Sequence, residues 1–393
     1  MISFDFSVPT KVLFGAGKLE SLRREKMPGK FALVVISNGK TVKERGYLDR
    51  VLAALKTQGI DYLIWDAISA NPGKDEVMAA AQYARDNFCD FVIGVGGASV
   101  IDSAKAVALM ARNPGDLWDY VVTGSGKGLP VRNPALPIIA VITTAGTGSE
   151  TDQWMVIDHR ELNEIIGFGV PTTFPTLSVV DPELTVSVPP FLTAVQGFDA
   201  FCHAAEGFIS KAATPISEAF SLQILRLISK FLPRAVQNGG DLEARTNIAL
   251  AGMLSGLVQT TSSTTSLHSI AHGLTAYHPD LPHGAALTIL SAAYFDFFAP
   301  YVPDRFIKMA HILGASTDNM DEAQKPFEFV KAMKILQENC GIADLKMSDY
   351  GITRDEMEKM ARNAHKTMSN LFAMDRYTLS LKETVSILEK SFR

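Results

Sequence analysis

Cysteine is scarce in this chain of 393 residues, and its three cysteines, Cys89, Cys202 and Cys340, lie far apart. Their odd number and the lack of a CxxC spacing argue against a disulfide framework and against a thiolate zinc site. Such cysteine usage is typical of a reducing compartment, and we therefore expect a cytoplasmic protein.

Long hydrophobic runs and excess positive charge are also missing. No apolar stretch approaches the roughly 20 residues that a membrane helix needs, and the opening MISFDFSVPTKVLFGAG has no basic region followed by an apolar run. We therefore expect neither a membrane protein nor a secretory signal. The formal net charge of -5 argues against nucleic acid as a partner, because phosphate binding depends on basic patches.

The composition favours a globular protein with a large core, since 47% of the residues are hydrophobic and 20% are charged. At roughly 100–200 residues per domain, the length predicts two or three domains. Up to about residue 188, short β-rich runs alternate with helical stretches, which predicts parallel βαβ units. The predicted strands are 31–37, 61–66, 90–95 and 137–143, and the predicted helices are 48–58, 76–87 and 101–111.

After Pro189-Pro190 the pattern changes to helical periodicity with few strand-like runs. The helices expected there are 193–210, 215–232, 241–260, 283–298, 321–338 and 378–391. The sequence thus predicts an α/β domain with a parallel sheet over residues 1–188, and an all-α domain over 189–393, with a cleft between the two.

A glycine-rich turn follows the predicted strand 90–95, in DFVIGVGGASVIDSAK (90–105). Gly94, Gly96 and Gly97 would let a ligand approach the backbone, and free amides at the start of the next helix, near Val100, would favour a pyrophosphate. The near match to GxGxxG is weak by itself, and the alternative is a tight βα turn with Ser99 as the N-cap.

A second polar turn, TTAGTGSET (143–151), follows the next predicted strand. Its hydroxyls suit phosphate or ribose contacts, although a Ser/Thr turn that satisfies its own backbone is the alternative. Two such turns at successive strand ends favour a nucleotide. Asp102, in the first turn of the helix after the glycines, either complements the helix dipole or faces a nicotinamide amide.

Histidines cluster in the second half. Asp199 and His203 are four residues apart, so on a helix they share one face. Downstream, four of the eight histidines fall within sixteen residues: His268, His272, His278 and His283. Imidazole and carboxylate ligands without thiolate suit Zn²⁺, Fe²⁺ or another first-row divalent ion. The alternative is a set of helix-capping and hydrogen-bonding residues.

These motifs together resemble the iron-containing, or group III, alcohol dehydrogenases over nearly the whole chain. The resemblance is carried by FSVPTKVLFGAG (6–17), GGASVIDSAK, TTAGTGSE (143–150), DPELTVSVPP, DAFCHAAEG and HSIAHGLTAYHPDLPHG. It implies a dehydroquinate synthase-like fold, with a Rossmann-like NAD(P)-binding domain over residues 1–188 and an all-helical metal-binding domain over 189–393. It also implies a cytoplasmic, often dimeric enzyme.

The resemblance also implies the residues of the site. The metal ligands would be Asp199, His203, His268 and His283, and His272 would lie near the substrate and the nicotinamide. We expect His272 to act as the proton relay, with His278 a weaker candidate; the alternative for His278 is a surface residue before Pro279. The NAD(P) contacts would come from Asn71, Gly96, Gly97, Ala98, Ser99, Asp102, Thr143, Thr144 and Thr147.

One departure from the family bears on the cofactor. NAD-preferring members tend to carry an Asp after the first strand of this domain, whereas this chain has Ser37, Asn38, Gly39 and Lys40. Loss of the acid removes repulsion against a 2′-phosphate, and the Ser, Asn and Lys side chains could bind one, so we expect NADP(H) to be preferred over NAD(H).

The expected activity is reversible hydride transfer between a primary alcohol and NAD(P), with Fe²⁺ as the divalent metal and Zn²⁺ as the other option. The expected partners are a small alcohol or aldehyde and further copies of the chain. The alternatives are a glycerol-dehydrogenase-like polyol oxidoreductase, a dehydroquinate-synthase-like lyase and a non-catalytic NAD(P)-binding protein. The lyase would need basic residues for a phosphate substrate, yet no Lys or Arg occurs over residues 161–210.

Overall fold

The computed structural model describes residues 3–393 and divides them into two compact units. The first unit is Ser7–Ser187, and the second is Val188–Arg393 together with residues 3–6. No described helix combines the length and the apolar character that a membrane span requires.

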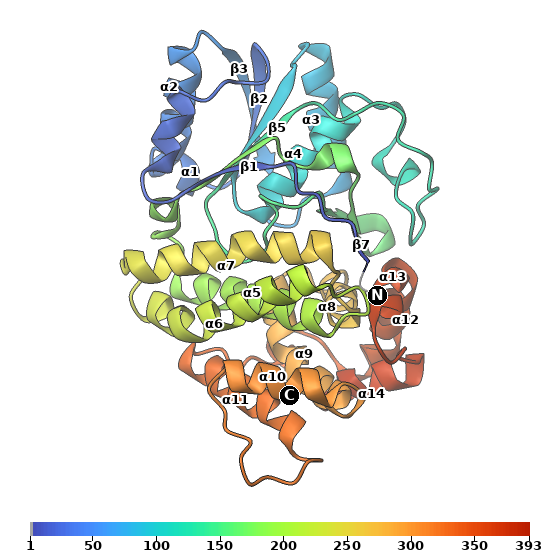
Figure 1. Cartoon of the computed structure of the whole chain (residues 1–393). Coiled ribbons are helices and arrows are strands. Elements are labelled where there is room, and N and C mark those ends of the chain that lie inside the picture. The colour runs from blue at the N-terminus through green and yellow to red at the C-terminus, as the bar shows by residue number, and fades with distance from the viewer. Residues whose placement is uncertain (1–2) are drawn as a thin grey trace. The chain divides into compact units, whose positions relative to one another are not determined.

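The first unit is built on a six-stranded, fully parallel sheet with the order β1-β8-β5-β4-β2-β3 (Figure 1). Its strands are β1 (Lys11–Phe14), β2 (Phe31–Ser37), β3 (Asp61–Ile68), β4 (Phe91–Gly96), β5 (Ile138–Ile142) and β8 (Leu177–Val180). The helices between them are α1 (Thr41–Glu44), α2 (Tyr47–Thr57), α3 (Lys74–Asp86) and α4 (Ala98–Met110).

Both faces of this sheet are covered, as its sequence requires. Successive residues of β2 point to opposite faces, so that Leu33 and Val35 pack into one apolar cluster, while Val34 and Ile36 pack into another. The first cluster contains residues of α3 and α4, and the second contains residues of α2. Strands buried on both sides read as continuous apolar runs, which explains why the sequence located the central strands so well.

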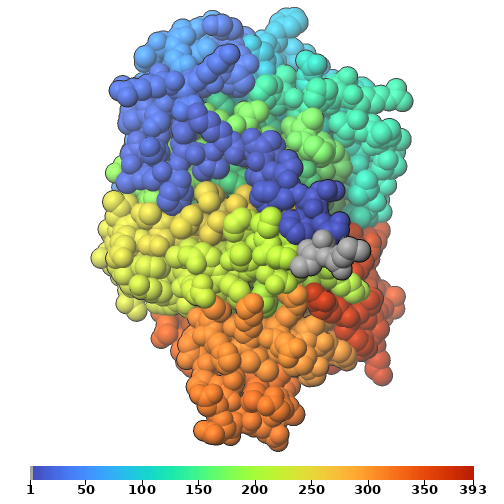
Figure 2. Space-filling view, in the orientation of Figure 1, coloured from blue at the N-terminus to red at the C-terminus, as the bar shows by residue number. Residues whose placement is uncertain are grey.

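The helical unit contains ten α-helices within the described residues (Figure 1). They are α5 (Pro190–Ile209), α6 (Pro215–Gln237), α7 (Leu242–Thr261), α8 (Ser266–Thr275), α9 (His283–Phe298), α10 (Pro303–Ile312), α11 (Glu328–Asn339), α12 (Met357–Thr367), α13 (Ser369–Met374) and α14 (Leu381–Ser391). The long connection between α10 and α11 forms a protruding tip of this unit, orange in the space-filling view (Figure 2).

The predicted fold class, a parallel α/β sheet followed by helices, is confirmed. Several boundaries were wrong. Helix α4 begins at Ala98 with Gly97 as its N-cap, rather than near Val100, and Ser99 lies inside the first turn. The helix expected over 321–338 begins only at Glu328. The sequence also missed an antiparallel hairpin, β6 (Met155–His159) and β7 (Glu164–Phe168), which turns through Asn163 in the left-handed region.

A buried ion pair ties α4 to the segment after β5. Lys105 is fully buried, and its Nζ lies 2.7 Å from Asp152 Oδ1, 3.0 Å from Ser149 Oγ and 2.6 Å from the Trp154 carbonyl oxygen. Burial raises the pKa of Asp152 to about 6, although Lys105 opposes this shift. The ammonium group therefore compensates a carboxylate that would otherwise be costly to bury.

Replacing Lys105 by Met should lower the free energy of unfolding by about 3–5 kcal/mol, because it leaves Asp152 buried without its cation. The matched control is Lys11→Met, which breaks the exposed pair with Glu25 and should cost at most about 1 kcal/mol. Urea unfolding of both variants measures the difference. Equal, small losses would show that the buried pair contributes little.

Candidate metal centre and cofactor loops

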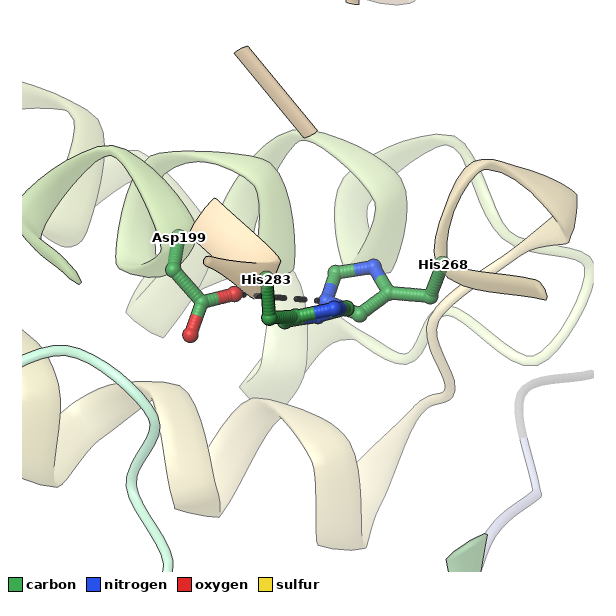
Figure 3. A group of neighbouring side chains, drawn as sticks. All are labelled: Asp199, His268 and His283. Atoms are coloured by element: carbon green, nitrogen blue, oxygen red, sulfur yellow. Dashed lines mark ion pairs between the residues drawn. The ribbon is translucent and has the colours of Figure 1, made fainter. Parts of the chain in front are cut away.

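Three side chains from three helices converge inside the helical unit (Figure 3). Asp199 of α5, His268 of α8 and His283 of α9 each offer one ligand atom, and these atoms all lie within 4.8 Å of one another. Asp199 Oδ1 is 3.4 Å from His268 Nε2. Residues that are 84 positions apart in the chain are thus brought to one point.

The close packing of α9 on α5 explains how His283 reaches this point. His283 is the first residue of α9, and the adjacent Gly284 lies against α5 so closely that a Cβ there would be 2.1 Å from the Val195 carbonyl oxygen. Only glycine permits such an approach of one backbone to another. The start of α9 is therefore held beside the turn of α5 that carries Asp199.

The donor atoms fit a cation. Within residues 3–393, Asp199 Oδ1, His268 Nε2 and His283 Nδ1 are buried and have no hydrogen-bond partner. Buried polar atoms are normally hydrogen-bonded, so three such atoms that lie close together without a hydrogen bond favour a shared cation. Carboxylate oxygen and imidazole nitrogen are donors that suit first-row divalent ions. The residues present therefore fit the metal that the sequence predicted.

The charges of the cluster depend on one another. Burial would raise the pKa of Asp199, but the imidazoles of His203, His268 and His283 hold it below its usual range. Burial lowers the pKa of His283 to about 4, with His268 adding to the shift. These directions leave the Asp199 carboxylate beside a neutral His283 imidazole at neutral pH, which are protonation states that bind metal. Burial would lower the pKa of His268 as well, but Glu206 and Asp199 raise it to about 10.

Two further predicted histidines border this group. His203 Nδ1 is 3.6 Å from Asp199 Oδ1, and its ring stacks on His268 with centroids 4.5 Å apart. His272 stacks on His283, also at 4.5 Å, and its buried Nδ1 has no hydrogen-bond partner within the described chain. Burial, reinforced by His283 and His268, lowers the pKa of His272 well below its usual value. His272 is therefore a neutral imidazole beside the ligands.

His278, the weaker candidate for a proton relay, is held elsewhere by its own partners. Its Nδ1 is 3.2 Å from the Tyr350 carbonyl oxygen, and its Nε2 is 3.3 Å from Glu356 Oε1. Both ring nitrogens are therefore engaged with groups outside the cluster. Neighbouring positions in the sequence did not distinguish His278 from the histidines of the site.

The sequence reasoning missed Glu206. This residue is fully buried on α5, seven positions after Asp199, and its carboxylate Oε2 contacts His268 Nδ1. The spacing of seven along a helix places the two carboxylates on one face, which was the signal available in the sequence. The sequence does not predict which histidine this carboxylate contacts.

The first predicted cofactor loop lies at the carboxyl end of β4. A Cβ on Gly96 would be 2.6 Å from Val100 Cγ2, so a side chain there would force the turn to shift, and one on Gly97 would be 3.2 Å from Thr144 Cγ2, a tight contact. The amides of Val100 and Ile101 donate to the Gly97 carbonyl. The amides of Ala98 and Ser99 precede them at the start of α4 and are available to an anion.

The other predicted cofactor residues surround this loop. The Ser99 hydroxyl donates to the Ala70 carbonyl, next to Asn71, and the Thr143 amide donates to the Gly96 carbonyl at 2.9 Å. Asp102 accepts hydrogen bonds from the Ser149 hydroxyl and, at 2.9 Å, from the Val156 amide. Asp102 thus joins the two loops within the unit. Thr144 and Thr147 belong to the second loop, where the Thr147 hydroxyl accepts from the Ser149 amide at 3.4 Å.

The turn after β2 carries the residues predicted to select the cofactor. Ser37 ends β2, the Asn38 amide donates to the Ile68 carbonyl at 2.9 Å, and Lys40 is the N-cap of α1. Lys40 forms no ion pair with another residue between 3 and 393, whereas the nearby Lys43 is 2.7 Å from Asp66. Gly39 completes the turn, with Ser37 Oγ 3.3 Å from the position of a Cβ.

The first unit has a parallel sheet with a glycine loop before a helix, and the helical unit buries a carboxylate beside imidazoles. This combination is typical of a metal-dependent enzyme that uses a dinucleotide. The comparison with known proteins agrees. The family model described as iron-containing alcohol dehydrogenase matches residues 9–182, and the model for the C-terminal part of that family matches residues 193–392. The chain belongs to the iron-containing alcohol dehydrogenase family.

Individual relatives extend over the whole chain. The 1,3-propanediol dehydrogenase of Citrobacter freundii is 32% identical over 393 residues, which cover 99% of each chain. The NADH-dependent butanol dehydrogenase A of Clostridium acetobutylicum is 30% identical and matches 100% of each chain. A crystal structure of an archaeal halo-thermophilic alcohol dehydrogenase from a Red Sea brine pool is 28% identical, with a TM-score of 0.95 and full coverage of both chains.

Membership of this family makes the protein an oxidoreductase that acts on alcohols and implies a divalent metal and a nicotinamide cofactor. The family and the activity class predicted from the sequence are both confirmed. The small-molecule type of substrate follows from the same assignment.

Replacing Asp199 by Asn, or His268, His283 or His203 by Ala, should weaken Co²⁺ binding by at least about tenfold, because each change removes a donor from the cluster. His272→Ala is the matched control inside the same cluster, and it should retain Co²⁺. Visible absorption of the bound ion against a competing chelator measures the dissociation constants. Unchanged Co²⁺ affinity in the first four variants would contradict the assignment of the ligands.

Proposed function

We propose that the protein catalyses reversible hydride transfer between a primary alcohol and a nicotinamide cofactor, with NADP(H) preferred and Fe²⁺ or Zn²⁺ as the metal. The observation that carries the proposal is the convergence of Asp199, His268 and His283 with their buried, unsatisfied donor atoms. His203 would complete the ligand set, since it lies 3.6 Å from Asp199.

A bound divalent cation would lower the pKa of the alcohol hydroxyl and polarise an aldehyde carbonyl. The work of the protein's own residues is to hold and orient that cation and to exclude water. Asp199 supplies the negative charge, and His283, whose pKa burial lowers to about 4, supplies a neutral nitrogen donor.

His272 is the proposed proton relay. Its ring lies against His283, and burial keeps its pKa far below its usual value, so the imidazole enters the reaction neutral. A neutral imidazole can accept a proton at a ring nitrogen when the alcohol is oxidised and return it when the aldehyde is reduced. Its buried Nδ1, which has no hydrogen-bond partner among residues 3–393, is free for such a contact.

The α/β unit would bind the cofactor through the two loops. The glycine loop places the amides of Ala98 and Ser99 at the start of α4 for the pyrophosphate. Asn71, Asp102 and the threonines of the second loop, Thr143, Thr144 and Thr147, would contact the ribose and the nicotinamide. The buried contacts of Asp102 with Ser149 and Val156 support a loop that is already formed before the cofactor binds.

The preference for NADP(H) is supported by charge. The turn from Ser37 to Lys40 contains no carboxylate that would repel a 2′-phosphate. Asp66, the carboxylate near this turn, is neutralised by Lys43. Lys40 has no such partner within the described residues, which leaves its ammonium group for a phosphate.

We further propose that the enzyme works in the cytoplasm as a homodimer or a larger homo-oligomer. The absence of excess basic charge supports small molecules rather than nucleic acid as its partners. A diol or polyol is a second candidate substrate, favoured by the similarity to a relative named 1,3-propanediol dehydrogenase.

Lys40→Ala should lower kcat/KM for NADPH about tenfold, because it removes a charge-assisted contact to the 2′-phosphate, and should leave NADH unaffected. Asn38→Asp should also shift the preference toward NADH, because the new carboxylate would repel the 2′-phosphate of NADPH. Initial rates with both cofactors measure the ratios. Equal or better use of NADH by the unaltered enzyme would overturn the proposed preference.

The activity itself is tested by following nicotinamide absorbance with NADPH, added Fe²⁺ or Zn²⁺, and a panel of aliphatic aldehydes, 3-hydroxypropanal and dihydroxyacetone. We expect metal-dependent reduction of the simple aldehydes, abolished in His268→Ala and restored in the unaltered enzyme by metal after chelation. Faster turnover of dihydroxyacetone would favour a polyol oxidoreductase. Full activity in a verified metal-free protein would refute the mechanism.

A further inference from the structure

Glu206 connects the candidate metal centre to the start of the helix that carries His268. It is fully buried on α5, and its Oε1 accepts hydrogen bonds from the Thr265 amide at 3.0 Å, the Thr265 hydroxyl at 2.9 Å and the His268 amide at 3.3 Å. Thr265 is the N-cap of α8, and its own side chain makes no capping hydrogen bond. A carboxylate from another helix therefore caps the N-terminus of α8, where a negative charge is favourable.

The second oxygen of Glu206 determines how the ring of His268 is protonated. Oε2 contacts His268 Nδ1. A carboxylate only accepts hydrogen bonds, so the proton of a neutral imidazole in this position resides on Nδ1, and the lone pair resides on Nε2. Nε2 is the atom that lies 3.4 Å from Asp199 Oδ1 and has no hydrogen-bond partner in the described part of the chain.

We infer that Glu206 is a positioning residue that selects the Nδ1-protonated tautomer of His268 and thereby presents Nε2 to the metal. The inference rests on the proposed metal site and goes beyond its ligands. A hydrogen bond from the far nitrogen of a metal-binding histidine to a carboxylate fixes the tautomer and the orientation of the ring. The three donors that bind Oε1 also hold the Glu206 side chain in this position.

The three donors make one substitution especially informative. In Glu206→Gln, the side-chain carbonyl oxygen must face the two amides and the Thr265 hydroxyl, since these groups donate. The amide NH₂ is then directed at His268 Nδ1 and donates to it. The proton of His268 moves to Nε2, which can no longer bind a cation. The near-isosteric change thus damages the site through the tautomer and not through packing.

Glu206→Ala should affect stability more than the tautomer of His268. It removes the cap of α8 and leaves a cavity, so it should lower the melting temperature more than Glu206→Gln does. It does not force the wrong tautomer on His268. If Glu206 had a purely structural role, Glu206→Ala would reduce both the melting temperature and the Co²⁺ affinity more than Glu206→Gln does.

The test measures Co²⁺ dissociation constants by visible absorption against a chelator, without alcohol or cofactor, together with melting temperatures of the metal-free variants. We expect Glu206→Gln to weaken Co²⁺ binding at least about tenfold and more than Glu206→Ala, while the melting temperatures follow the reverse order. Asp375→Asn is the matched control, because this buried carboxylate contacts Tyr294 and Ser266 but makes no contact with His268; it should change Co²⁺ affinity less than about twofold.

A Glu206→Gln protein that binds Co²⁺ like the unaltered protein would overturn the inference, as would equal losses in Glu206→Gln and Asp375→Asn. Larger Co²⁺ loss in Glu206→Ala than in Glu206→Gln would assign Glu206 a purely structural role. If Glu206→Ala fails to fold, the comparison of Glu206→Gln with Asp375→Asn still decides. Because no turnover is measured, failure of the proposed alcohol oxidation would leave this outcome unaffected.

Discussion

The burial of Asp199 is the constraint on which the candidate metal centre depends. This carboxylate is only 3% exposed, and an ionised carboxylate in such a place is costly unless positive or hydrogen-bonding groups compensate it. Its nearest compensating groups are imidazoles, which carry no fixed charge at neutral pH. The cluster is therefore balanced either by protons on its histidines or by a divalent cation, and the cation supplies more charge at the point where the donor atoms meet.

Helix α5 carries Asp199 and two of the residues that surround the candidate metal centre. Asp199, His203 and Glu206 follow one another at spacings of four and three, so all three project from one face of the helix. Asp199 and His203 face the site, and Glu206 holds the start of α8, which carries His268. His268 of α8 is therefore positioned by α5 through the Glu206 carboxylate, while His283 is positioned through the contact of Gly284 with the α5 backbone.

The sequence predicted those features that leave a local signal. The buried strands β2, β4 and β5 appear as short apolar runs, and Asp199 and His203 appear as a pair on one helix face. The hairpin of β6 and β7 lacks such a run and was missed. Helix α8 was missed as well, because it is short and contains histidines and threonine in place of a clear apolar repeat. His278 stands in the same histidine cluster, yet Tyr350 and Glu356 hold it elsewhere. Partners that lie some 70 or more residues away leave no local pattern.

The same reasoning about buried charge applies to the cofactor loops. Asp102, Glu150 and Asp152 are all buried near one cation, Lys105, so the group holds more acids than bases. Burial raises the pKa of Glu150 to about 7 and that of Asp152 to about 6, with the neighbouring carboxylates adding to both shifts. A pKa near neutrality means that Glu150 retains a proton for part of the time. Each retained proton lowers the negative charge around Lys105, so partial protonation makes this excess of carboxylates tolerable in the core.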